Sequence, residues 1–534
     1  MMAGLQGALP RQSATPGSKS YGTALAILSF LAVALIGVLL RPALPVDETR
    51  YLAVAWEMHQ SGDWLVPTKN FAAYSDKPPL LFWTINLVWS LTGVSGIAAR
   101  MVGPGFAALM LWQTGRLARA LWPDQPGIDT RATLALLGLP VFAALGGLTM
   151  FDAALSVAVL AGLLALLRAG AGARLGWLCL GAAIALGVLA KGPVVLLHLL
   201  PAALTLPLWH PSRPSWRQGL RITGLGLLAG ALILMLWLVP AAIHGGAEYR
   251  RAILWTQSAG RVAESFAHAR PFWFYLALMP LLAFPWAWVL RLWPAAWQAD
   301  WHQGGLRLCL IWSLAALTAF SLISGKQLHY LFPELPALAL IAARLAGPAP
   351  VSLRLAVLPF GLAALAILLL GAGLLPAGPA LADLHPSSTL TAVALILLAV
   401  IWAALTAPGL VGGAILSLGL VLSANLVVGL TDLGRRYDTA AIAAVIAPRQ
   451  DRGIAWIDGR YSAEFNFAGR LTRPVDLPDP AELPAWIAAH PGGVILGTST
   501  SPGPGWRPAL HLPFRNKIHA IWLVPDHPMP EVKP

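Results

Sequence analysis

Acidic and basic side chains gather in one short stretch of this chain, just after its first long apolar segment. The stretch contains Asp47-Glu48-Thr49-Arg50-Tyr51, Glu57, Asp63 and Asp76-Lys77-Pro78-Pro79. Only 11% of the 534 residues are charged, so this concentration is unusual for the chain. Charge at a membrane face is costly to place and generally has a function. A carboxylate here can act as a general base or orient a substrate, and a lysine can neutralise an anion.

The composition predicts that these residues belong to an all-α polytopic membrane protein. Hydrophobic residues make up 57% of the chain and the mean hydropathy is +0.69, whereas soluble domains carry roughly 25% charged residues. Apolar runs long enough to cross a bilayer predict about thirteen transmembrane helices. These runs lie at 22–40, 99–118, 131–148, 150–168, 175–190, 192–209, 220–241, 272–291, 308–324, 330–347, 353–374, 388–407 and 409–430. The shorter run 80–92 follows two prolines, which favours an interfacial or re-entrant helix.

The arginines predict the orientation of the spans, because cytoplasmic loops are enriched in Lys and Arg. They recur in alternate loops, at Arg116/Arg119/Arg131, Arg168/Arg174, Arg213/Arg217/Arg221, Arg291/Arg307 and Arg344/Arg354. We therefore expect residues 1–21 to be a disordered cytoplasmic N-terminus, 22–430 to be the transmembrane domain, and its first loop, 42–98, to be periplasmic. The scattering of the arginines also argues against nucleic acid as the reason for the net charge of +13.

Residues 431–534 alternate between helix-like and strand-like runs. Strands are predicted at 454–457, 494–496 and 518–524, and helices at 438–447 and 481–489. Such alternation predicts a small α/β domain. An odd number of spans places this domain in the periplasm, on the same side as loop 42–98.

The motifs of the membrane part resemble a known family. Asp47-Glu48-Thr49-Arg50-Tyr51, Gly62-Asp63-Trp64 and Lys77-Pro78-Pro79-Leu80 are followed in order by Phe151-Asp152, Ala190-Lys191-Gly192-Pro193, Arg270-Pro271 and Ser324-Gly325-Lys326 through His329-Tyr330. This order is similar to that of bacterial lipid A aminoarabinose transferases. Those enzymes are grouped with the protein O-mannosyltransferases among the GT-C-type glycosyltransferases that use polyprenyl-phosphate sugars.

The resemblance implies transfer of a sugar from undecaprenyl phosphate to an acceptor, with inversion at the anomeric carbon. The leaving phosphate gains negative charge as the glycosidic bond breaks, so cations near it stabilise the transition state. The donor-phosphate ligands expected from the matching motifs and the outer loops are Lys77, Arg261, Arg270, Lys326 and Tyr330. The residues expected to bind or orient substrate are Arg50, Tyr51, Glu57, Lys191 and His329. The alternative interpretation of the cations is that they extend to lipid headgroups.

Asp47 and Asp152 are the expected catalytic carboxylates. Asp47 is the natural general base for a hydroxyl acceptor. A phosphate acceptor is already ionised near neutral pH, so Asp47 would then orient the acceptor, bind an amino group or hold a divalent cation. Structural alternatives are helix capping by Asp47 or Glu48 and an N-cap role for Asp152. Glu48 is expected to be structural.

A divalent metal ion is not required by any ligand spacing in the sequence, but Asp47 and Asp76 could hold one, with His59 as a further ligand. The family pattern usually has glutamate before the lysine of the Lys-Pro-Pro motif, where this chain has Asp76. Glu334 lies between two prolines, and is expected either to face substrate or to be paired internally. The segment 242–270 is interpreted as a lid or as a simple interfacial loop.

Three functions remain open at this point. The first is an inner-membrane transferase that moves 4-amino-4-deoxy-L-arabinose to lipid A phosphate, a modification of lipopolysaccharide that would confer polymyxin resistance. The second is a polyprenyl-phosphate-mannose or other hexose transferase that acts on protein or another glycan. The third is a lipid or sugar transporter, against which the gathering of charge on one face argues.

Overall fold

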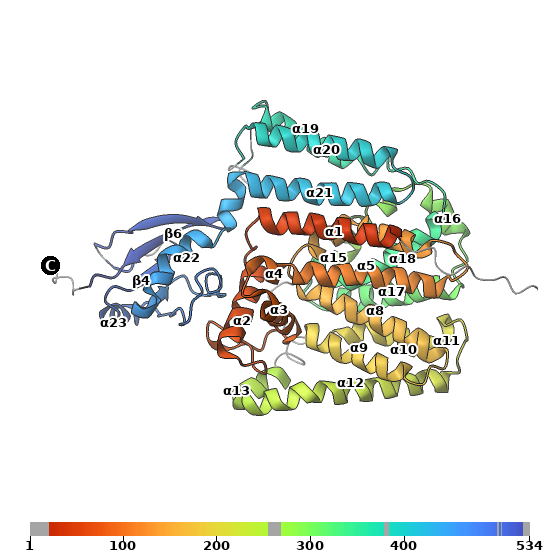
Figure 1. Ribbon diagram of the computed structural model, residues 1–534, viewed down its shortest axis with the longest axis horizontal. Coiled ribbons are helices and arrows are strands. Elements are labelled where there is room, and N and C mark those ends of the chain that lie inside the picture. Colours follow the sequence, from red (N-terminus) through yellow and green to blue (C-terminus); the bar gives the residue numbers. More distant parts are fainter. Residues whose placement is uncertain are drawn as a thin grey trace, which may run out of the picture.

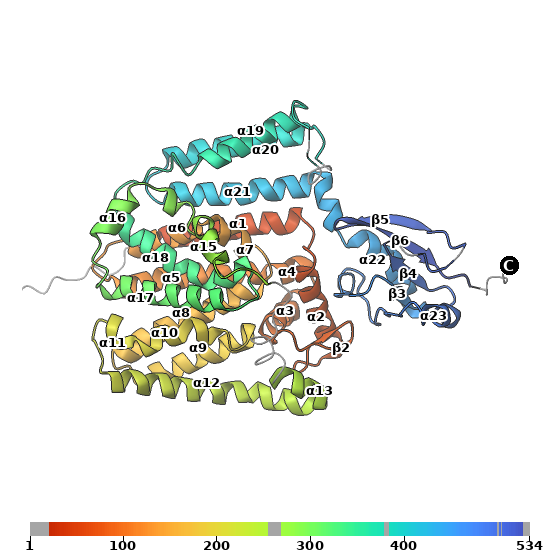
Figure 2. The same ribbon diagram turned by 180° about the vertical axis from the view of Figure 1, so that it is seen from behind.

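The computed structural model describes residues 21–254, 269–376, 378, 384–498, 501–503 and 505–526. The predicted disorder of 1–21 therefore lies almost entirely outside the described residues. A bundle of helices forms most of the molecule, and a small sheet with two helices lies at one end of it (Figure 1). The view from behind gives the same arrangement (Figure 2).

Seven helical segments of the described residues are long and apolar enough to cross a membrane, or up to eight if one bent pair is a single span. The seven are α1 (Tyr21–Leu40), α8 (Phe151–Gly170), α12 (Trp216–His244), α17 (Gly304–Leu322), Leu328–Ala346, α20 (Ser388–Thr406) and α21 (Val411–Leu430). Leu328–Ala346 joins η4 (Leu328–Glu334) to α18 (Leu335–Ala346). The bent pair is α6 (Ile128–Leu137) and α7 (Pro140–Gly146), which meet at 75°. The chain is therefore a multi-pass membrane protein.

The other predicted spans fall on helices that are shorter, broken or less apolar. They are α5 (Val102–Leu121), α9 (Gly176–Lys191), α10 (Val195–Leu204) with α11 (Leu206–Trp209), and α19 (Leu358–Gly371). The run 272–291 does not form one continuous helix, because α15 (Phe274–Leu282) ends before Pro285 and only η3 (Trp286–Trp288) follows. The count of thirteen is not confirmed, since glycines and prolines interrupt apolar runs that composition alone treats as continuous.

The remaining helices lie outside the spans. The first loop contains α2 (Asp47–Ser61), the two-residue strands β1 (Thr68–Lys69) and β2 (Ala72–Ala73), α3 (Leu80–Thr92) and α4 (Gly96–Arg100). The prediction of a short helix over 80–92 is confirmed as α3. Elsewhere lie α13 (Gly246–Arg251), α16 (Leu292–Gln298), η6 (Asp432–Tyr437) and η7 (Ala447–Arg452).

Small residues allow α9 and α12 to pack closely. A Cβ added to Gly181 of α9 would lie 2.6 Å from the Ala229 Cβ and 2.8 Å from the Gly230 nitrogen. Side chains at these positions would therefore push the helices apart, as in other membrane bundles where small residues line helix contacts. The approach matters because these two helices form the walls of the cavity described below.

The far end of the chain forms a four-stranded sheet in the order β3-β4-β6-β5. Its strands are β3 (Ile454–Trp456), β4 (Val494–Gly497), β5 (Leu510–Phe514) and β6 (Lys517–Leu523), with α22 (Ala440–Ile446) and α23 (Leu483–Ala489) packed nearby. β3 and β4 are parallel, and the other two pairs are antiparallel. The sequence did not predict β5, which pairs with β6 across the turn at Arg515 and Asn516.

The sheet region is attached directly to the first loop. Asn70 donates from Nδ2 to the Val475 carbonyl and accepts from the Val475 nitrogen, both at 2.8 Å. Trp56 donates to the Leu471 carbonyl at 2.9 Å, and Trp89 stacks on Phe467 with ring centroids 5.6 Å apart. Loop 42–98 and residues 431–526 thus share one end of the bundle (Figures 1 and 2).

Several of the loops expected in the cytoplasm also lie together. Arg307 donates to the Leu208 carbonyl at 2.6 Å. Gln303 Oε1 accepts from both Trp122 Nε1 at 3.1 Å and Arg344 Nε at 3.2 Å. These contacts join loops that are far apart in sequence, as expected if they occupy one side of the membrane.

Candidate active site

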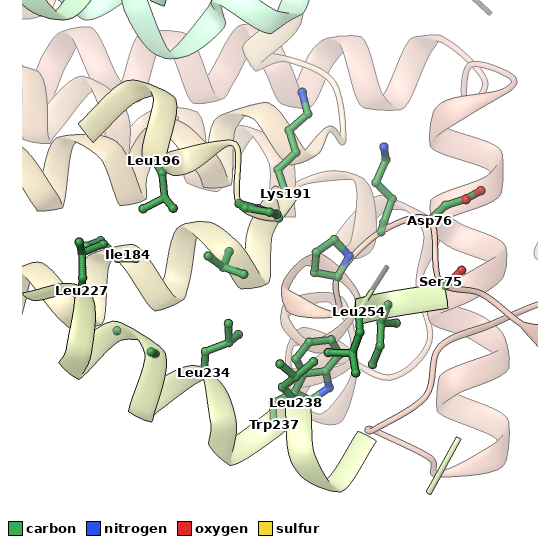
Figure 3. A pocket seen from close by; sticks show the side chains of 18 of the residues that line it. Ser75, Asp76, Ile184, Lys191, Leu196, Leu227, Leu234, Trp237, Leu238 and Leu254 are labelled. Atoms are coloured by element: carbon green, nitrogen blue, oxygen red, sulfur yellow. The ribbon is translucent and has the colours of Figure 1, made fainter. Parts of the chain in front are cut away.

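A cavity of about 350 Å³ lies between α9, α12, the segment after α13 and the Lys77 segment of the first loop. Its walls are mostly apolar: Ile184, Val188, Leu196, Leu227, Ala231, Leu234, Trp237, Leu238, Ile253 and Leu254. Its charged residues are Asp76, Lys77 and Lys191. Figure 3 shows the Lys191 side chain pointing away from Leu227 and Leu234 of α12. The cavity therefore combines a long apolar wall with a cationic head.

Lys191 is held where three helical elements meet. It is the last residue of α9, and its Nζ lies 2.5 Å from Oδ1 of Asp152 in the first turn of α8. The same ammonium lies 4.9 Å from the centre of the Tyr330 ring in η4. Asp152 is 3% exposed, and it does not cap α8 through its side chain. A buried carboxylate paired in this way fixes the position of the ammonium.

Asp47 occupies the first turn of α2 with its carboxylate accessible. Its Oδ1 accepts from Arg50 Nη2 at 2.5 Å and from Tyr51 Oη at 3.0 Å. The side chain is still 48% exposed, so other lone pairs can reach a ligand. Tyr51 is buried against Phe151, with ring centroids 4.7 Å apart, and this packing links α2 to the start of α8. No side-chain cap of α2 forms, so capping does not explain Asp47.

His329 lies close enough to four charged groups of this region to interact with them electrostatically. Asp152, Lys191, Asp47 and Lys77 each interact with its imidazole. Lys77 also interacts with Asp152. The structure thus brings Asp47, Lys77, Asp152, Lys191 and the His329-Tyr330 pair into one cluster at the head of the cavity.

Glu57 is placed away from this cluster. Its carboxylate accepts from the backbone nitrogens of Asn70 and Phe71, each at 2.8 Å, and from Asn466 Nδ2 at 3.0 Å. Burial raises its pKa above the usual range although these donors oppose the shift. Through these hydrogen bonds the Glu57 carboxylate joins the first loop to the sheet region, which is a structural role.

Lys326 and Arg270 are brought together, but not at the cavity. Lys326 is 4% exposed, and its Nζ donates to the carbonyls of Arg270 at 3.0 Å and Ile323 at 2.5 Å. Arg270 itself is exposed and lies over Phe274. The Lys326 ammonium therefore ties two chain segments together. Arg261 lies outside the described residues, as do residues 255–268 of the segment interpreted as a lid.

The buried Glu48 network could not be located from sequence. Arg41 Nη1 and the Leu44 nitrogen both donate to Glu48 Oε2, at 2.5 and 2.9 Å, and the Thr149 nitrogen donates to Oε1 at 3.1 Å. Burial acts to raise the Glu48 pKa, but Arg41 and Arg100 outweigh it and lower the pKa below its usual range. This confirms a structural Glu48. The only sequence signal was Arg41 at the end of the first span.

Glu334 is paired internally. Its Oε1 lies against His198 Nδ1, and both side chains are buried. Their other polar atoms, Glu334 Oε2 and His198 Nε2, have no hydrogen-bond partner among the described residues. Of the two expectations for Glu334, internal pairing is confirmed. His198 was missed, because a single histidine in an apolar run carries no distinguishing pattern.

The described residues contain no group of three or more His, Cys, Asp or Glu side chains that could hold a metal ion. His59 instead contacts Asn86 Oδ1 at 3.2 Å. A metal role for Asp47 and Asp76 therefore stays a prediction from sequence.

Comparison with known proteins finds similar proteins in the families that the motifs resemble. Residues 76–240 match the family described as dolichyl-phosphate-mannose-protein mannosyltransferase. An undecaprenyl phosphate-alpha-4-amino-4-deoxy-L-arabinose arabinosyl transferase of Pseudomonas aeruginosa is 34% identical over 307 residues, which cover 55% of this chain and 54% of that protein. One from Sodalis glossinidius is 32% identical over 358 residues, covering 62% and 61%. The matched region thus spans about half the length of the first of these curated relatives.

A solved structure shares the fold of nearly the whole chain. The crystal structure of ArnT from Cupriavidus metallidurans bound to undecaprenyl phosphate superposes with a TM-score of 0.75, at 19% identity, over 94% of this chain and 98% of that one. The apo structure of the same protein gives the same score. The sequence matches confirm the resemblance to the glycosyltransferases, and the structural match establishes the fold.

Proposed function

We propose that this chain is an inverting glycosyltransferase of the bacterial inner membrane. It moves 4-amino-4-deoxy-L-arabinose from undecaprenyl phosphate to a phosphate of lipid A at the periplasmic face. The observation that carries the proposal is the cavity with an apolar wall and a cationic head beside an accessible carboxylate. The names of the matched relatives supply the sugar and the lipid carrier.

The cavity suits a polyprenyl phosphate because its two parts match the two parts of that molecule. The apolar residues of α9 and α12 offer a surface for the isoprenoid chain, whose burial is favourable in proportion to apolar area. Lys77 and Lys191 stand at the end where the phosphate would lie. Their charge stabilises the phosphate most when the bond from the anomeric carbon to the phosphate oxygen breaks and its electron pair leaves with the oxygen.

The carboxylates take different parts in this scheme. Asp152 holds Lys191 in place through the 2.5 Å contact, and so acts as a positioning residue. Asp47 is held by Arg50 and Tyr51 and directs its accessible lone pairs to the acceptor or to the amino group of the sugar. A lipid A phosphate oxygen then attacks the anomeric carbon from the face opposite the leaving phosphate. A hydroxyl acceptor would instead lose its proton to Asp47.

The orientation follows the charge of the loops. The arginine-containing loops lie in the cytoplasm, and α2 with the sheet region of 431–534 lies in the periplasm. The N-terminus is then cytoplasmic and the C-terminal α/β domain periplasmic. Support comes from the contacts that join the first loop to the sheet region at one end of the bundle.

The decisive experiment combines purified protein, undecaprenyl-phosphate aminoarabinose and lipid A, with mass spectrometry of the lipid A. We expect the mass of one aminoarabinose to be added. Transfer of mannose or another hexose to a protein or glycan, with lipid A unchanged, would instead support the second candidate, which the matched mannosyltransferase family favours. Movement of the lipid across liposomes without any transfer would identify a transporter and overturn both.

A further inference from the structure

A second cavity, of about 320 Å³, lies in the C-terminal sheet region. It is lined by Trp456, Asp458, Arg460, Glu464, Thr498, Phe514, Arg515, Asn516, Lys517 and His519. The residues come from the end of β3, the following loop, the position after β4 and the β5–β6 hairpin. Its volume is within the range of roughly 300–1,000 Å³ that is usual for small-molecule sites. It is separate from the cavity at α9 and α12, with which it shares no lining residue.

Three polar atoms of this cavity's lining are buried without a hydrogen-bond partner among the described residues. They are Trp456 Nε1, Asp458 Oδ2 and His519 Nδ1. Trp456 is 8% exposed and His519 4%, and their rings stack with centroids 5.3 Å apart. A buried polar group without a partner is costly, so its retention calls for a ligand or water. The three atoms include a donor, an acceptor and a nitrogen that can be either.

The rim of the cavity is cationic. Arg460, Arg515 and Lys517 are exposed side chains of the lining, against the carboxylates Asp458 and Glu464. Glu464 is already used, since its Oε2 accepts from the Ser462 nitrogen at 2.8 Å. Arginine and lysine at a rim suit a phosphate. An unpartnered carboxylate oxygen inside suits a hydroxyl or ammonium donor and disfavours a bare anion.

We propose that this cavity binds a phosphorylated saccharide. The three cations bind the phosphate, while Asp458, His519 and the Trp456 indole bind hydroxyl or amino groups of the sugar. Resting on the proposed function, the ligand is the phosphorylated amino-sugar head group of the acceptor lipid. A free saccharide phosphate has the same chemistry and is the other source of such a ligand.

The placement of the cavity suits a site that captures the acceptor. Glu464 of its lining is followed two residues later by Asn466, which donates to Glu57 of α2. Ala53 of α2 packs in the same apolar cluster as Trp456 and Phe514 of the cavity wall. The helix that begins at Asp47 is therefore packed against the wall of this cavity.

The test uses the full chain in detergent and measures binding by calorimetry. Its probes are an acyl-free phosphorylated glucosamine disaccharide, the same disaccharide without phosphate, and inorganic phosphate. The variant Arg515→Gln/Lys517→Gln removes two exposed cations of the rim, so folding should be retained. We expect it to weaken binding of the phosphorylated disaccharide by about tenfold or more, as loss of charge-assisted bonds implies. Arg473→Gln/Arg507→Gln removes two exposed cations outside the lining and should leave binding unchanged.

A second variant, Asp458→Asn, tests the sugar contacts. It should weaken binding of the disaccharide while leaving the weak binding of inorganic phosphate unchanged. Equal affinity of wild type and Arg515→Gln/Lys517→Gln for the phosphorylated disaccharide would overturn the proposal. So would inorganic phosphate binding as tightly as the disaccharide, because the site would then recognise no sugar.

Steady-state transfer separates the two sources of the ligand. A raised KM for lipid A with unchanged kcat in Arg515→Gln/Lys517→Gln identifies the lipid head group, and an unchanged KM identifies a free saccharide phosphate. Failure of the proposed function is distinguishable from failure of this site. Absence of transfer by the wild type would remove the function but leave the disaccharide binding measurable.

Discussion

Asp47 and Glu48 are neighbours in the first turn of α2, yet they lie on different sides of that helix and differ in exposure and in bonding partners. On the open side, Asp47 is held by Arg50 and Tyr51 but keeps an accessible carboxylate. On the bundle side, Glu48 is 2% exposed and is bonded to Arg41 and two backbone nitrogens. The contrast teaches that two adjacent acids of one helix can differ in role: Glu48 is bonded within the protein, whereas Asp47 keeps lone pairs that a ligand can reach.

The largest effect should come from the open side. Asp47→Ala and Lys77→Ala should each lower transfer by about 10²–10³-fold, because Lys77 neutralises the leaving phosphate and Asp47 holds the acceptor or the amino group of the sugar. Thermal unfolding in detergent should remain close to that of the wild type. The check is single-turnover transfer to lipid A by mass spectrometry. Wild-type turnover in both variants would contradict the proposed active site.

A substitution on the bundle side of α2 should mainly lower stability. Glu48→Ala leaves the buried Arg41 and Arg100 without their anion, and should lower the free energy of unfolding by about 3–5 kcal/mol. Denaturant titration of the purified protein measures this. Asp47→Ala is the matched control one residue away. An equally large loss of stability in that control would show that the two sides of α2 do not differ.

Lys191 and Lys326 extend the comparison to two lysines with similar motif contexts. Lys191→Met should lower transfer by about 10–100-fold through loss of charge at the phosphate. Lys326→Met should instead lower stability by about 1–3 kcal/mol, because the carbonyls of Arg270 and Ile323 lose their donor. The readouts are the kcat for transfer and the unfolding midpoint. A kcat for Lys326→Met as low as that for Lys191→Met, in protein of normal stability, would contradict this assignment.

The smallest effect is a difference in pH dependence between two acids of α2. The pKa of Glu48 is lowered in the fold, so its stabilisation is present above its unfolded pKa and is lost as the pH falls through the folded value. The pKa of Glu57 is raised, so stability falls as the pH rises from its usual range through the folded value. Glu48→Gln should flatten the acid limb of the stability profile. Glu57→Gln should reduce the loss of stability that occurs as the pH rises above the usual pKa range of glutamate. A stability profile unchanged in both variants would contradict these two pKa assignments.

Much of the fold could be predicted from the chain. Apolar length marked the long helices α1, α8, α12, α20 and α21 within a few residues, because a bilayer demands about twenty apolar residues in a row. The strands β3, β4 and β6 coincide with the predicted strands at 454–457, 494–496 and 518–524. Breaks inside apolar runs were harder, since the bend of 75° between α6 and α7 falls at Gly138-Leu139-Pro140, which apolar length alone does not mark.

The sequence by itself determined that this is a membrane protein with a charged first loop, and which residue types could do chemistry there. Only the tertiary structure decided which of them lie together. Lys191 and Lys326 look alike in sequence, but only Lys191 meets Asp152 and the cavity. The physical reason is that the surroundings of a charged group determine whether it can bind a ligand. Lys326 is held by backbone carbonyls away from the cavity, whereas Lys191, although paired with Asp152, also lines an apolar cavity that can admit a ligand.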